Sequence, residues 1–184
     1  MNILESVLNA DGGGAVSQIA KTLGMGESQA QSAIGQLLPV LARGLSNNAS
    51  TQEGLGGLLG ALGRGDHQRY VDDPRILGNS ESVQEGNGIL GHIFGSKDVS
   101  RQVASRASEK TGVGSDLIKK MLPMVATMVM GALSKQASSA GMVGTQTVPQ
   151  QASGLSGLAS FLDFDKDGSI ADDLLGLAAK RFFS

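Results

Sequence analysis

Apolar residues recur at intervals of three and four along most of the chain, which is the spacing of amphipathic helices. No segment shows the alternation of β-branched and polar residues that is typical of strands. The pattern therefore predicts an all-α fold, a multihelical bundle, with helices over residues 2–9, 15–23, 27–48, 98–110, 115–137 and 154–162, and a last one that ends at Phe183.

The clearest helical pattern runs from Glu27 to Asn48. Its apolar face carries Ala30, Ala33, Ile34, Leu37, Leu38, Leu41 and Leu45. Pro39 lies inside this stretch, and an internal proline removes one backbone hydrogen bond and clashes with the preceding turn. We therefore expect the helix to be kinked or restarted near Pro39.

Changes in composition divide the chain into five parts. Glycine costs roughly 1 kcal/mol against alanine inside a helix, so the glycine-rich middle should hold only short helices. A later stretch rich in Ser, Gln, Gly and Thr is typical of a linker. We expect a first helical repeat over 1–49, a partly mobile connecting region over 50–97, a second helical repeat over 98–137, a linker over 138–153, and a helix–acidic loop–helix appendage over 154–184.

Two pairs of helices have similar sequences. In each pair a polar amphipathic helix is followed by a Gly-x-Gly turn and a longer apolar helix that contains Leu-Pro. The turns are residues 23–26 and 111–114, and the prolines are Pro39 and Pro123. Repeated units that cannot each bury an apolar face usually pack together, so the pattern favours a pseudo-symmetric domain. The alternative is that helix, glycine turn and helix recur by chance.

Composition indicates an aliphatic core and no global charge field. The chain is 40% hydrophobic, with five Phe, one Tyr and no Trp, and its formal net charge is -2. Such a charge gives no general attraction to nucleic acid, although it leaves room for a local basic patch. We therefore expect nucleic acid to be an unlikely partner.

The chain carries no feature of export or membrane insertion. Its start lacks a basic region followed by a long apolar run, and it contains no cysteine. The longest apolar run, from Met121 to Leu133, is shorter than the ~20 residues that span a bilayer. We expect a cytoplasmic protein without a membrane span.

An acidic loop near the C-terminus gives the strongest chemical signal. Its oxygen-bearing side chains alternate, a glycine follows at the sixth position, and an apolar residue stands at the eighth, as in a calcium loop of the EF-hand kind. A bidentate glutamate is expected at position 12, where Leu174 stands, so Asp173 or Asp172 would have to close the site. The candidate ligands for Ca²⁺ are Asp163, Asp165, Asp167, Ser169, Asp173 and Asp172.

A helix cap is the alternative explanation for the acidic loop. Ser169 followed by Asp172 fits an N-cap with an acidic third residue, which the helix dipole favours. A cap needs only one or two acids, however, and five acids lie between Asp163 and Asp173. Because such a cluster repels itself without a cation, the sequence favours calcium.

Three other motifs carry weaker signals. Gly86-x-Gly88-x-x-Gly91 matches a dinucleotide fingerprint in letters, but no strand precedes it and no βαβ unit follows. Residues 17–34 have the rhythm of a helix-turn-helix, yet the second helix lacks the Arg or Lys that would reach DNA. His67 and His92 have no second ligand in view, so surface or packing roles are favoured.

Several of these segments together resemble a known family. They are the stretch from Gly86 to Gly95, the Thr-Gly-Val-Gly turn, the run from Met121 to Gly131, and the tail from Asp163 to Asp173. The chain resembles the YidB-like bacterial family, catalogued as domain of unknown function 937. The resemblance implies a helical, cytoplasmic protein and brings no catalytic residues with it.

No catalytic set of side chains emerges from the sequence. There is no carboxylate pair, no Ser/His/Asp set and no phosphate loop. We expect a non-enzymatic helical scaffold or protein-interaction module, self-associating or bound to a protein partner, with one structural calcium loop. A DNA-associated regulatory protein with helix-turn-helix-like repeats is the alternative, and it predicts a basic face.

Overall fold

The computed structural model describes residues 14–63 and 66–139, and all regular structure in these ranges is helical. The prediction of an all-α fold is confirmed for this part of the chain. The expected helix over 2–9, the linker after residue 139 and the acidic loop lie outside the described residues. The helices are α2 (Gly14–Leu23), α3 (Glu27–Ala49), α4 (Gln52–Gly63), α5 (Arg69–Asp72), α6 (Ser80–Phe94), α7 (Lys97–Thr111) and α8 (Ser115–Ser139), with 3-10 turns η2 (Asp66–Gln68) and η3 (Pro74–Gly78) beside α5.

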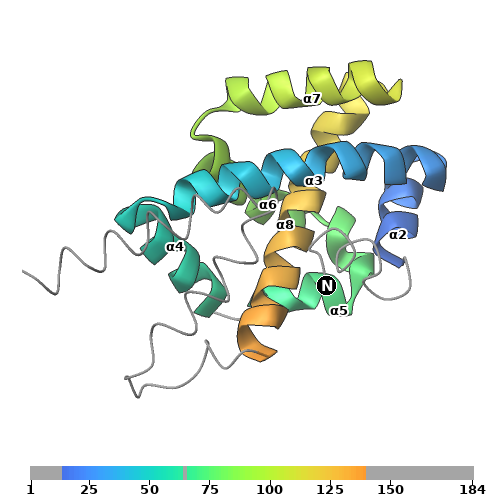
Figure 1. Ribbon diagram of the computed structural model, residues 1–184. Coiled ribbons are helices and arrows are strands. Elements are labelled where there is room, and N and C mark those ends of the chain that lie inside the picture. The colour runs from blue at the N-terminus through green and yellow to red at the C-terminus, as the bar shows by residue number, and fades with distance from the viewer. Residues whose placement is uncertain (1–13, 64–65, 140–184) are drawn as a thin grey trace, which may run out of the picture.

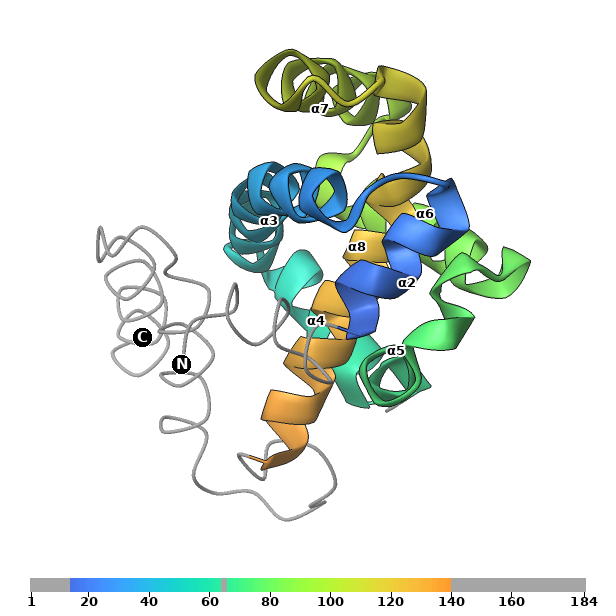
Figure 2. The same ribbon diagram turned by 90° about the vertical axis from the view of Figure 1, so that its right-hand side faces the viewer.

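Helix α8 is the centre of the fold, and the other helices pack around it (Figure 1 and Figure 2). Every residue from Met121 to Ser134 is buried. Side chains from α2, α3, α4, α6 and α7 join it in one aliphatic core, in which Ile19, Leu37, Leu41 and Ile118 are fully buried. The methionines of α8 are therefore part of the core.

By length and composition, α8 is also the one described helix that could cross a membrane. In its most apolar 18-residue window, 83% of the residues are buried against the rest of the protein. A helix buried in a protein core can have the same length and apolar composition as a membrane span. The absence of a membrane span therefore stays a prediction.

Helix α6 makes the most extensive contact with α8, and a glycine permits it. The backbone of Gly86 lies against the backbone of Pro123, so closely that a Cβ atom added at Gly86 would collide with the Pro123 carbonyl. The Pro123 carbonyl oxygen also accepts a hydrogen bond of 3.2 Å from the Thr127 hydroxyl. The segment 50–97 thus supplies a central packing helix of 15 residues, where the sequence predicted only short helices.

The two predicted Gly-x-Gly turns are present between α2 and α3 and between α7 and α8. Gly24 has a φ of 67° and Gly112 a φ of 72°, in the left-handed region that glycine adopts without strain. In the first turn, the Met25 amide donates to the Ala20 carbonyl at 3.0 Å. In the second, the Gly112 amide donates to Ser108 at 2.8 Å. Each turn lets a long helix leave its predecessor at a new angle.

The sequence predicted a kink or a restart near Pro39, and the restart is wrong, because α3 continues through Pro39 from Glu27 to Ala49. The residues on either side explain why the helix is kept. Leu38 is 1% exposed and Leu41 is fully buried. A restart would pull these side chains out of the core, and this costs more than one missing backbone hydrogen bond.

Candidate functional site

The candidate calcium ligands of the acidic loop all lie outside the described residues. They are Asp163, Asp165, Asp167, Ser169, Asp172 and Asp173. Within residues 14–63 and 66–139, no group of three or more His, Asp or Glu side chains could hold a metal ion. The calcium site therefore stays a prediction from the sequence.

The glycines of residues 86–91 do not form the turn between strand and helix that a dinucleotide-binding site needs. All three glycines lie within helix α6, and none stands in a turn between a strand and a helix. Gly86 is taken up by the contact with Pro123. An added Cβ atom at Gly88 or Gly91 would meet no atom within 4 Å. The first glycine therefore serves helix packing.

A polar cluster centred on the buried Tyr70 joins α5 to α6. The Tyr70 hydroxyl donates a hydrogen bond of 2.5 Å to Glu85 Oε2. Arg69 Nη2 donates to Glu85 Oε1 at 2.8 Å and to Glu81 Oε1 at 3.0 Å. His67 Nδ1 lies 3.7 Å from Glu85 Oε2. We call these five residues the Tyr70 cluster.

Burial of the Tyr70 ring and then the hydrogen bond to Glu85 raise the pKa of its hydroxyl to about 12, although Arg69 acts in the opposite direction. The Arg69 guanidinium lies 4.9 Å from the centre of the same ring. Hydrogen bonds to Tyr70 and then to Glu81 hold the pKa of Arg69 above its usual range. At neutral pH the tyrosine is a neutral donor and the arginine is a cation, so the cluster is a structural tie between α5 and α6.

A mainly apolar cavity lies where α4 faces the ends of α3 and α6. It has a volume of about 430 Å³, and we call it the apolar groove. Asn48 Nδ2 donates a hydrogen bond of 2.8 Å to the His92 carbonyl across the α3 and α6 walls. The lining residues are Leu45, Asn48, Thr51, Glu53, Gly54, Gly57, Leu58, Ala61, Ile89, His92, Ile93 and Met130.

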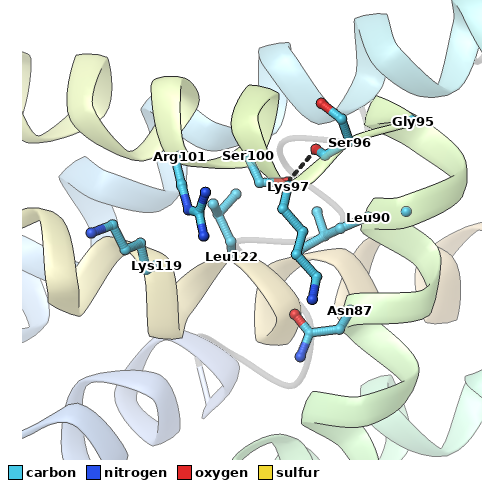
Figure 3. A pocket seen from close by; sticks show the side chains of 10 residues that line it. Asn87, Leu90, Gly95, Ser96, Lys97, Ser100, Arg101, Lys119 and Leu122 are labelled. Atoms are coloured by element: carbon cyan, nitrogen blue, oxygen red, sulfur yellow. Dashed lines mark hydrogen bonds between the residues drawn. The ribbon is translucent and has the colours of Figure 1, made fainter.

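A second cavity, of about 440 Å³, lies between α6, the start of α7 and the first half of α8 (Figure 3). Three cationic side chains surround it, Lys97 and Arg101 from α7 and Lys119 from α8. We call it the basic pocket. Its other lining residues are Asn87, Leu90, Gly91, Gly95, Ser96, Ser100 and Leu122.

Sequence reasoning missed both cavities and the Tyr70 cluster. One signal for the cluster is visible in hindsight, since the single tyrosine of the chain stands beside Arg69 and precedes two glutamates spaced four apart. Glu81 and Glu85 therefore share one helix face. The cavities draw on three or four helices each, and no local pattern brings such residues together.

Comparison with known families shows what this chain is similar to. The model of a family described as a bacterial protein of unknown function, DUF937, matches residues 5–136. This confirms the resemblance seen in the glycine-rich and methionine-rich segments. Neither a curated protein nor a solved structure matches the chain.

Proposed function

The chain belongs to the DUF937 family of bacterial proteins of unknown function, and we propose that it is a non-enzymatic helical interaction module that self-associates through the apolar groove. The observation that carries this proposal is the groove itself. Leu45, Leu58 and Met130 line it with apolar side chains, and α4 contributes Gly57, where an added Cβ atom would meet no atom within 4 Å. Small residues on a helix face let another helix approach closely.

A second copy of the same chain is the occupant that the chemistry favours. Helix α4 carries a single charged residue, Glu53, in twelve. Its surface exposes Leu59, which is 40% exposed, beside Gly56 and Gly60. A helix with so little charge suits an apolar groove, and a second copy brings that same helix.

Filling the groove should abolish self-association. An added Cβ atom at Gly57 meets no atom within 4 Å, so Gly57→Leu can start an apolar side chain at the wall of the groove. We expect the wild-type mass in sedimentation equilibrium to rise with concentration toward a dimer, and Gly57→Leu to stay a monomer. Gly88→Leu is the matched control, since that position on α6 is equally open and does not line the groove.

Two outcomes would overturn the self-association. One is a wild-type chain that remains monomeric at every concentration. The other is an equal loss of dimer in Gly57→Leu and Gly88→Leu, because that result would trace the effect to added surface leucine and not to the groove.

We also propose that the acidic loop binds one structural Ca²⁺, on the strength of its alternating oxygens and the glycine at the sixth position. Titration calorimetry with Ca²⁺ should give saturable heat with the full chain and none with an Asp163→Ala, Asp165→Ala variant. Absence of heat with the wild-type chain would leave the loop as a helix cap.

We also propose a cytoplasmic location. The absence of cysteine fits this location, where thiols stay reduced and disulfides rarely form.

The alternative of a DNA-associated regulator receives less support from the arrangement of charge. The first turns of α3, which would be the reading helix, carry Glu27, Ser28 and Gln29 and no Lys or Arg up to residue 36. Of the eleven Lys and Arg residues in the described ranges, six stand on α7 and the start of α8. A DNA helix reader needs its basic residues on the helix that enters the groove. We therefore propose that the repeated helix pairs serve to pack the fold and do not read DNA.

A further inference from the structure

We propose that the basic pocket binds a small organic phosphate, with the phosphate held at the end formed by Arg101 and Lys119, Lys97 adding attraction from the other end, and an apolar part resting on the pocket floor. This inference is independent of the apolar groove. The two cavities share no lining residue.

The charge of the pocket wall selects an anion. Its ten lining residues include three cations and no carboxylate. The three cations come from two helices, and Figure 3 shows Arg101 and Lys119 beside each other at one end and Lys97 close to Asn87 at the other. A phosphate monoester carries two negative charges, so cations at both ends of the cavity attract it more strongly than they attract a singly charged carboxylate.

The existing ion pairs leave these cations available. Arg101 pairs with Asp98 at 2.8 Å and Lys119 pairs with Asp116 at 3.1 Å. Both carboxylates lie in solvent, with side chains 79% and 88% exposed. Exposed pairs of this kind are weak, so an incoming phosphate can compete for both cations. Lys97 makes no ion pair within the described residues.

Neutral donors complete the polar wall. The Asn87 amide and the Ser100 hydroxyl line the same cavity. The Ser100 hydroxyl donates a long hydrogen bond of 3.4 Å to the Ser96 carbonyl. The N-terminal turn of α7 begins at this wall, and the partial positive charge of a helix start adds to the attraction for an anion.

The floor of the pocket favours an organic ligand over a bare ion. Leu90 and Leu122 line it and are 5% and 1% exposed. A volume of about 440 Å³ lies within the range of small-molecule sites, which is roughly 300 to 1,000 Å³. Phosphate alone would leave most of this volume, and both leucines, unused.

Titration calorimetry with phenyl phosphate, inorganic phosphate and a short DNA duplex tests the proposal on the full chain. Phenyl phosphate should bind, and inorganic phosphate should bind more weakly because it does not reach the leucines. Lys119→Gln should weaken phenyl phosphate binding about tenfold or more, which is the usual effect of losing one charge-assisted hydrogen bond. Lys97→Gln should weaken it by less, because Lys97 attracts the phosphate from the other end of the cavity.

The matched control is Lys120→Gln, which removes the same charge from the next residue of α8, outside the pocket. It should leave the affinity unchanged, and far-ultraviolet circular dichroism should verify that all variants are folded. The proposal is overturned by absence of heat with phenyl phosphate, or by equal weakening in Lys119→Gln and Lys120→Gln. Tighter binding of the DNA duplex, lowered equally by all three variants, would assign this face to nucleic acid instead.

Discussion

Replacing Gly86 with alanine is expected to lower the free energy of unfolding by about 2 to 3 kcal/mol, even though alanine favours helix. The new Cβ atom would collide with the Pro123 carbonyl, which belongs to the backbone of the central helix and cannot rotate away. Relief requires the backbones of α6 and α8 to move apart at this contact. Urea unfolding followed by circular dichroism gives this free energy directly.

Gly88→Ala is the matched control for that measurement. Gly88 lies two residues further along α6, on an exposed face where an added Cβ atom meets nothing within 4 Å. Here only the helix propensity changes, so the variant should be more stable than the wild-type chain by about 0.5 to 1 kcal/mol. Two glycine-to-alanine changes in one helix should thus have opposite signs. If both stabilise the fold, the close contact between Gly86 and Pro123 is wrong.

The second large effect is expected in the ultraviolet titration of Tyr70. The chain has one tyrosine and no tryptophan, so tyrosinate absorbance reports this residue alone. The folded chain should titrate near pH 12, against about 10 for the unfolded chain, because burial and then the bond to Glu85 disfavour the phenolate. The absorbance should be read within seconds of a pH jump, before the chain unfolds.

The raised pKa has a consequence for stability with a definite sign. Since the folded state holds the proton more tightly, the contribution of Tyr70 is complete below pH 10 and is lost as the pH rises through about 12. Tyr70→Phe should therefore lose less stability across this window than the wild-type chain. In Glu85→Gln the titration midpoint should fall but stay above 10, because burial remains. A folded wild-type chain that titrates at 10 would contradict the buried cluster.

Local pattern was enough to predict four of the helices nearly to the residue. The apolar spacing of α3 and α8 and the glycine turns at Gly24 and Gly112 depend on neighbours within a few residues. The importance of α6 could not be predicted in this way. Its glycines argue against a stable helix, and the reason for Gly86 is Pro123, which is distant in sequence.

The candidate sites depend even more on distant residues. The apolar groove needs Leu45 from α3, Leu58 from α4, Ile93 from α6 and Met130 from α8. In the sequence, none of these four residues can be told apart from an ordinary residue of the hydrophobic core. The proposed calcium loop is the reverse case, because the ligands of such a loop are local in sequence and can be proposed without a fold.

The burial of the methionines in α8 also determines their reaction with oxidants. Met121 and Met128 are fully buried, and Met124 and Met130 are 4% and 3% exposed. Peroxide can reach these thioethers only when the helices around α8 come apart, and each sulfoxide then places a polar group in the core. Oxidation of one methionine therefore makes the next opening easier, so damage to this protein should accumulate in an all-or-none manner, molecule by molecule.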